Sequence, residues 1–187
     1  PKEHIWQSGA SKNAQAVPFI ANMPTEEVYT APLKTGVNGF VSNTKPFVYQ
    51  GNVIDGFKLT FKDGEIVKVQ AASGEKLLQE LIQTDEGAKY LGEIALVPHE
   101  SPISASNVLF FNTLFDENAS NHFAIGEAYP TCVEGARGLT AEELEKMGIN
   151  TSIVHEDFMI GSAGMDITGE LADGTKEPIF IKGAWAF

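Results

Sequence analysis

Histidine and acidic side chains gather at two places in the sequence where their spacing would suit a metal ion. His155 and Asp157 are two residues apart, so on an extended strand both would project to the same side, with Glu156 on the other. Glu117 and His122 flank a polar stretch that can bend as a loop and bring both toward one point. Taken alone, each pair is more often a surface ion pair or a hydrogen-bonded histidine. Together they make a metal site a reasonable hypothesis.

Other catalytic motifs are missing from the sequence. It contains no His-Glu-x-x-His, no Gly-x-x-x-x-Gly-Lys and no Gly-x-Ser-x-Gly, so zinc sites borne on one helix, nucleotide loops and serine-hydrolase turns have no support. Cys132 is the only cysteine, which excludes an internal disulfide and suits a reducing compartment. We interpret it as a small packed residue rather than a nucleophile.

The composition is that of an acidic globular protein. The 187 residues include 13 basic and 25 acidic side chains, a net charge of -12. Nucleic acids and anionic membranes favour clustered lysine and arginine, so we expect neither as a partner. No stretch approaches the roughly 20 apolar residues that span a bilayer, and the first residues have no apolar signal core. We therefore expect a cytoplasmic protein.

Residue periodicity predicts an α+β fold that is rich in strands, with a mixed or antiparallel β-sheet and a few peripheral helices. Apolar and polar residues alternate over 57–62 and resume over 66–69, and the Asp63-Gly64 pair between them predicts a hairpin. A second hairpin is predicted to join 166–171 to 178–182 through Asp173-Gly174, with Pro178 at an edge or at the strand start.

The remaining elements are short. Ser73 is predicted to cap a helix over 76–82, and Thr140 with Glu143 forms a capping box for another. Short apolar runs predict buried strands at 94–97, 108–111 and 153–154. No repeat or linker divides the chain, so we expect a single domain over 1–187.

Four segments of the chain carry a resemblance to a known family. They resemble the metallo-aminopeptidase family of aminopeptidase T, aminopeptidase S and PepS, in the same order and spacing along the chain. The similarity falls on the C-terminal half of such enzymes, which implies a longer chain whose N-terminal α/β domain is absent here. The segments are Asn22-Met23-Pro24-Thr25-Glu26-Glu27-Val28, Leu114-Phe115-Asp116-Glu117-Asn118-Ala119-Ser120-Asn121-His122, Gly126-Glu127-Ala128-Tyr129 and His155-Glu156-Asp157-Phe158-Met159-Ile160-Gly161-Ser162.

The resemblance also implies a set of site residues around two divalent metal ions, which could be zinc, cobalt or manganese. Glu93 would bridge the two ions, and Tyr129 would donate to the developing oxyanion. Glu26 is our candidate for the catalytic base, although register leaves open whether Glu26 or Glu27 is the ligand. The implied metal ligands are Glu27, Glu93, Glu117, His122, His155 and Asp157.

The activity implied by the resemblance is hydrolysis of N-terminal residues from peptides by water that a dinuclear metal centre activates. The resemblance implies a homodimer in the full-length enzyme. Two alternatives stay open: a non-catalytic dimerisation or interaction fragment, and a two-metal amidohydrolase that acts on another amide. Stoichiometric metal uptake would separate the first alternative from an enzyme.

Overall fold

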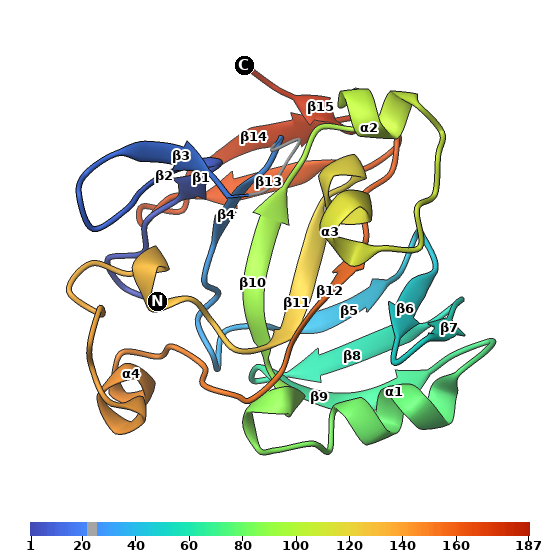
Figure 1. The fold of residues 1–187 in the computed structure, drawn as a ribbon, viewed down its shortest axis with the longest axis horizontal. Helices are drawn as coiled ribbons and strands as arrows, with labels where there is room; N and C mark the ends of the chain where they lie inside the picture. Colours follow the sequence, from blue (N-terminus) through green and yellow to red (C-terminus); the bar gives the residue numbers. More distant parts are fainter. Residues whose placement is uncertain (22–25) are drawn as a thin grey trace.

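The computed structural model describes residues 1–21 and 26–187, so the segment 22–25 of the first family-like motif lies outside the described residues. An antiparallel five-stranded sheet occupies the centre (Figure 1). Smaller two- and three-stranded sheets and short helices surround it, which confirms the predicted α+β class. The strands of the central sheet, in spatial order, are β1 (Gln7–Ser8), β4 (Val28–Thr30), β10 (Leu91–Leu96), β11 (His122–Gly126) and β12 (His155–Met159).

One face of the central sheet is covered by an apolar core. Phe158 of β12 packs against Phe57 with ring centroids 5.3 Å apart and against Phe123 at 6.2 Å. Burying an aromatic side chain of this size stabilises the fold by about 1.5–3 kcal/mol. The elements that complete this core are β5 (Gly39–Ser42), β6 (Phe47–Tyr49), β7 (Asn52–Ile54), β8 (Lys58–Lys62), β9 (Glu65–Gln70) and α1 (Glu75–Leu81).

Both predicted hairpins are confirmed. Asp63 and Gly64 connect β8 to β9 with φ angles of 49° and 87°, the positive values that a tight two-residue turn requires. The second hairpin joins β13 (Ile167–Glu170) to β14 (Lys176–Ile181), and β15 (Ala184–Trp185) follows. Pro178 is the third residue of β14, but β15 pairs with β14 only at Phe180 and Ile181, so Pro178 meets the expectation of an edge position.

The helices agree with the sequence in one case and correct it in another. Helix α4 (Ala141–Lys146) has the predicted capping box, with Thr140 and Glu143 bonding reciprocally. Helix α1 begins at Glu75 after a left-handed Gly74, so the prediction of Ser73 as its cap is wrong. The Ser73 hydroxyl instead donates to the Val53 carbonyl oxygen at 3.2 Å, which ties it to the neighbouring β7.

A second, smaller apolar cluster packs around Cys132, whose side chain is buried as predicted. Burial raises the pKa of the Cys132 thiol to about 11, so it stays protonated at neutral pH. The remaining short elements are β2 (Ala10–Lys12), β3 (Pro18–Ile20), α2 (Pro102–Ala105), α3 (Thr113–Asp116) and the 3-10 turns η1 (Gly87–Lys89), η2 (Glu117–Ala119) and η3 (Pro130–Cys132).

Two of the predicted buried strands are wrong. Residues 108–111 form a loop, because the buried Asp116 carboxylate accepts the backbone N–H groups of Phe110 and Asn112 that a strand ladder would need. At 153–154 the strand starts later, at His155, and Ile153 is 82% exposed. The Asp85 carboxylate accepts the Ile153 N–H there. The third run, 94–97, lies largely within β10, as predicted.

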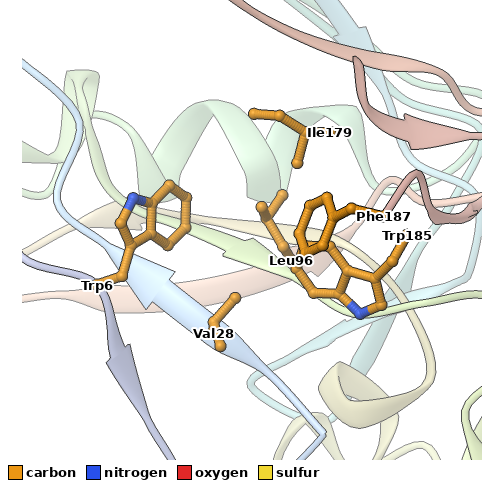
Figure 2. Close-up of a pocket in the computed structure, with 6 residues that line it drawn as sticks. All are labelled: Trp6, Val28, Leu96, Ile179, Trp185 and Phe187. Atoms are coloured by element: carbon orange, nitrogen blue, oxygen red, sulfur yellow. The ribbon is translucent and has the colours of Figure 1, made fainter. Parts of the chain in front are cut away.

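An apolar groove opens beside the central sheet. It has a volume of about 500 Å³, and Figure 2 shows aromatic and aliphatic side chains from both ends of the chain around it. Two of its lining residues, Val28 and Leu96, lie across from each other on the paired strands β4 and β10. The groove is lined by Trp6, Val28, Leu96, Ile179, Trp185 and Phe187.

Among the described residues, no helix is long and apolar enough to cross a membrane.

The two Asp-Gly hairpins provide a matched test of close backbone packing. Gly64 and Gly174 have nearly equal φ angles of 87° and 85°, but a Cβ on Gly64 would collide with the Lys34 carbonyl oxygen, whereas Gly174 faces open space. We expect Gly174→Ala to cost about 1–2 kcal/mol of unfolding free energy for the positive φ alone. Gly64→Ala should cost about 1–3 kcal/mol more, from overpacking. Urea unfolding measures both, and equal losses would contradict the close approach.

Candidate metal centre

The register of the central strands places four polar side chains on the face opposite the apolar core. Ala95 of β10 lies directly across from Tyr29 on one side and from His122 on the other, so all three share a face. Glu93 precedes Ala95 by two residues and Glu27 precedes Tyr29 by two. The alternation of side chains therefore turns both carboxylates toward His122.

Strand β12 adds two further side chains to the same face. Asp157 lies across from Ala124, and His155 across from Gly126. Both project together, as the His-x-Asp spacing predicts, while Glu156 points to the other face. Glu117 reaches the same point from η2, and one carboxylate oxygen lies within 4.8 Å of ligand atoms of His122 and Asp157.

Distances within the cluster make Glu93 its centre. The His122 Nε2 atom lies 3.1 Å from Glu27 Oε2 and 3.5 Å from Glu93 Oε1. The His155 Nε2 atom lies 3.9 Å from Glu93 Oε2 and 3.6 Å from Asp157 Oδ1. The two carboxylate oxygens of Glu93 thus face different histidines, and its side chain joins the two halves of the cluster.

Each histidine is oriented by a backbone carbonyl group. His122 Nδ1 lies 3.0 Å from the Ser120 carbonyl oxygen, and His155 Nδ1 lies 2.7 Å from that of Glu127. A carbonyl oxygen only accepts, so in both rings Nδ1 must donate. In the neutral imidazole Nε2 is then free of hydrogen and directs its lone pair into the cluster, an arrangement typical of histidine ligands to metals.

The cluster fits a divalent cation better than it fits an uncharged core. Three of its atoms are buried without a hydrogen-bond partner among the described residues: His122 Nε2, Glu27 Oε2 and Asp157 Oδ1. Such atoms cost about 1–3 kcal/mol each when nothing satisfies them. The donor set of nitrogen and oxygen without thiolate suits zinc, cobalt or manganese. The residues that would hold a cation form three groups: Glu27, Glu93 and His122; Glu93, His155 and Asp157; and Glu117, His122 and Asp157.

The pKa values of Glu117 and Glu93 in the metal-free cluster lie above those of exposed carboxylates. Burial, together with the charge of Asp157, raises the pKa of Glu117 to about 8. Burial also raises the pKa of Glu93, which is 5% exposed, although the neighbouring His122 opposes the shift. Burial lowers the pKa of His155, but the interaction with the neighbouring Asp157 carboxylate outweighs this and brings the pKa to about 9.

Glu26 and Tyr129 occupy different places relative to the cluster. The Glu26 N–H donates to the Asn118 side-chain oxygen at 3.3 Å, and its carboxylate belongs to none of the three groups found among the described residues. Of the two neighbouring glutamates, Glu27 is therefore the one in the cluster. The Tyr129 ring lies at the rim, 43% exposed and 4.7 Å from the His155 ring centroid. Burial and the nearby carboxylates raise the pKa of its hydroxyl, which stays protonated.

Sequence reasoning missed the side chain that joins the two acidic segments. Asn118 is fully buried, and its amide accepts from Glu26 N–H and donates to the Leu114 carbonyl oxygen. It thereby connects the residues just before β4, which include Glu27, to the turn that carries Glu117. The sequence offered only a polar run at 117–122, which is typical of an exposed loop and gives no sign of a buried amide.

Substitution of the two adjacent glutamates tests which one contributes to metal binding. Glu27→Gln should reduce the affinity for zinc or cobalt at least about 100-fold, because it removes a charged oxygen from a buried group that faces His122. Glu26→Gln should leave the affinity within about twofold, as expected of a side chain outside the cluster. Competition with a chromophoric chelator measures both constants. A larger loss in Glu26→Gln would reverse the assignment.

The pKa shifts also predict how the stability of the metal-free chain changes with pH. The folded state holds protons on Glu117 up to about pH 8 and on His155 up to about pH 9, whereas the unfolded chain releases them near its ordinary values of 4.5 and 6.5. The folded state therefore binds more protons, so the free energy of unfolding should fall as pH rises from about 5 to 9. Thermal unfolding in chelator measures this trend. A constant Tm across the range would contradict it, and added divalent cation should flatten the decline.

Comparison with known proteins places these observations in a family. Residues 1–185 match the family described as thermophilic metalloprotease (M29). The whole chain is 58% identical to aminopeptidase AmpS of Bacillus subtilis and covers 46% of that protein. Over 184 residues it is 57% identical to aminopeptidase 2 of Geobacillus stearothermophilus, of which it covers 45%.

A solved structure agrees in fold. Wild-type AmpT from Thermus thermophilus superposes with a TM-score of 0.93 at 43% identity, over 99% of this chain and 45% of that one. The chain thus spans a little under half the length of the curated relatives it matches. The extent of the family match, with this degree of identity, shows that the chain belongs to the M29 family of thermophilic metalloproteases.

Proposed function

We propose that this chain carries the metal-dependent catalytic site of an aminopeptidase, which removes residues from the N-termini of peptides. The single observation that carries the proposal is the convergence of four carboxylates and two imidazole Nε2 atoms on one buried face of the central sheet. Membership of a metalloprotease family implies a divalent metal ion. The two relatives, aminopeptidase AmpS and aminopeptidase 2, are named for cleavage at peptide N-termini, which supports the choice of substrate.

The centre is proposed to hold two ions rather than one. Glu93 is shared between one group with Glu27 and His122 and another with His155 and Asp157, as a bridging ligand would be. Four ionised carboxylates would balance the charge of two divalent cations, whether zinc, cobalt or manganese. When bound, such a pair supplies Lewis-acid polarisation of the scissile carbonyl group and acidifies water.

Residues at the rim of the cluster would handle the substrate and the protons. The Tyr129 hydroxyl, protonated at neutral pH beside His155, would donate a hydrogen bond to the scissile carbonyl oxygen as that oxygen gains charge. Glu26 stands next to Glu27 but outside the cluster, and is proposed as the base that passes a proton to the leaving amine. The carbonyl groups of Ser120 and Glu127 hold the two histidines in place throughout.

The proposal also covers the substrate, the oligomeric state and the cellular location of the full-length enzyme. A peptide with a free N-terminus is the substrate, the full-length enzyme is a homodimer, and it works in the cytoplasm. An amidohydrolase that acts on another amide would share the metal chemistry but would not need a free α-amine. A non-catalytic dimerisation or interaction fragment would have no use for three overlapping metal-binding groups.

Metal removal and reloading tests the function directly. The chain, stripped with a chelator and reloaded with cobalt or zinc, should take up about two ions, and the full-length enzyme treated in the same way should hydrolyse leucyl-anilide, as expected of a two-metal peptidase. The matched control is N-acetyl-leucyl-anilide, which has the same amide bond without the free amine and should not be cleaved. Cleavage of both substrates would favour the other amidohydrolase. Absence of metal uptake would overturn the proposal in favour of the interaction fragment.

A further inference from the structure

His155 lies on an edge strand of the central sheet. It is the first residue of β12, and β12 is an edge strand of the central sheet, so only β11 supports it through the ladder. Its ring is fixed at the back by the 2.7 Å hydrogen bond from Nδ1 to the Glu127 carbonyl oxygen. The direction of Nε2 therefore depends on where that carbonyl group is held.

The segment 150–154 holds Glu127 by its backbone and its side chain. The Glu127 N–H donates to the Val154 carbonyl oxygen at 2.7 Å, and the Ser152 N–H donates to the Glu127 carboxylate at 2.5 Å. On either side, the buried Asn150 side-chain amide donates to the Gly126 carbonyl oxygen at 2.6 Å, and the Asn150 backbone carbonyl oxygen accepts from Ala128 N–H. Glu127 thus moves only if this segment moves.

Asp85 anchors the segment in turn. Its carboxylate accepts the Ser152 hydroxyl at 2.9 Å, the Ile153 N–H at 2.7 Å and the Ala88 N–H at 2.7 Å. The last contact belongs to η1, just before β10, so one carboxylate bridges the segment to the rest of the fold. The Ser152 hydroxyl also accepts the Val154 N–H, so the residue before His155 is held by the same side chain.

Two glycines allow the backbone of segment 150–154 to pack closely against neighbouring backbone. A Cβ at Gly87 would collide with the Thr151 carbonyl oxygen, and one at Gly126, where φ is 102°, with the Val154 carbonyl oxygen. Backbone packed this closely has little room to shift without breaking hydrogen bonds. The hydrogen bonds and the close contacts together form one rigid connection from Asp85 to Glu127.

We propose that Asp85 is a positioning residue for His155, acting through Ser152 and Glu127 to aim the imidazole into the metal centre. This inference rests on the proposed function, since it takes His155 as a ligand. Asp85 itself belongs to none of the three metal-binding groups of the described residues, so its influence is exerted wholly through hydrogen bonds. Partners behind a ligand histidine commonly change metal affinity about 10- to 100-fold, and the longer path from Asp85 favours the lower end of that range.

Substitution of Asp85 tests the connection with a matched control elsewhere in the chain. Asp85→Asn removes acceptor capacity without changing the size of the side chain, and should weaken cobalt affinity about tenfold. It should also alter the visible absorption spectrum of the bound cobalt, because a turned imidazole changes the ligand field. Asp55→Asn is the control: Asp55 also accepts one side-chain group and a backbone N–H, from the Asn43 amide and Gly56, but belongs to none of the three metal-binding groups found among the described residues.

A second variant distinguishes a loss of histidine positioning from a loss of the folded state. Ser152→Ala removes only one contact with Asp85 and should reproduce the spectral change in part, and the double variant should show less than the sum of the two effects on affinity. Equal cobalt affinity and unchanged spectra in Asp85→Asn and Asp55→Asn, with metal uptake intact in the unaltered chain, would overturn the positioning role alone. Failure of the unaltered chain to bind cobalt would overturn the proposed function together with it.

Discussion

Like charges meet on a buried face of the central sheet, and the surrounding structure is arranged to hold them there. Water screens charges poorly when they are buried, so carboxylates that face one another at close range repel strongly. Two imidazoles and retained protons offset part of that repulsion in the metal-free chain. The apolar core around Phe158, on the reverse face of the same strands, supplies the rigidity that keeps the charged face assembled. The central sheet therefore has a stabilising apolar core on one face and a cluster of mutually repelling carboxylates on the other.

The sequence predicted what depends on neighbouring residues and missed what depends on distant ones. The alternation around His155 and Asp157 is local and follows from strand geometry, so it could be read directly. Glu27 and Glu93 meet only because Val28 pairs with Leu96 across more than sixty residues, and no local pattern indicates that pairing. Their place in the site came from the family resemblance alone.

Errors in the predicted elements share a physical cause, which is competition for backbone N–H groups. The apolar run at 108–111 has the composition of a strand, but Asp116 takes the donors that a ladder would use. Asp85 does the same at 153. Side-chain acceptors of this kind offer the backbone an alternative to sheet pairing, and the partners lie several to many residues away. Periodicity cannot reveal such contacts, although isolated acidic residues at the ends of apolar runs are a hint.

The position of β12 at the edge of the sheet has a consequence for how the centre comes into being. A chain is synthesised from its N-terminus, so Glu27, Glu93 and His122 leave the ribosome before His155 and Asp157. Only one of the three groups, that of Glu27, Glu93 and His122, can assemble without the last strand. The other two close when β12 pairs with β11. A nascent chain therefore assembles this one group first, and the other two groups that could hold a cation form only when the last strand of the central sheet is added.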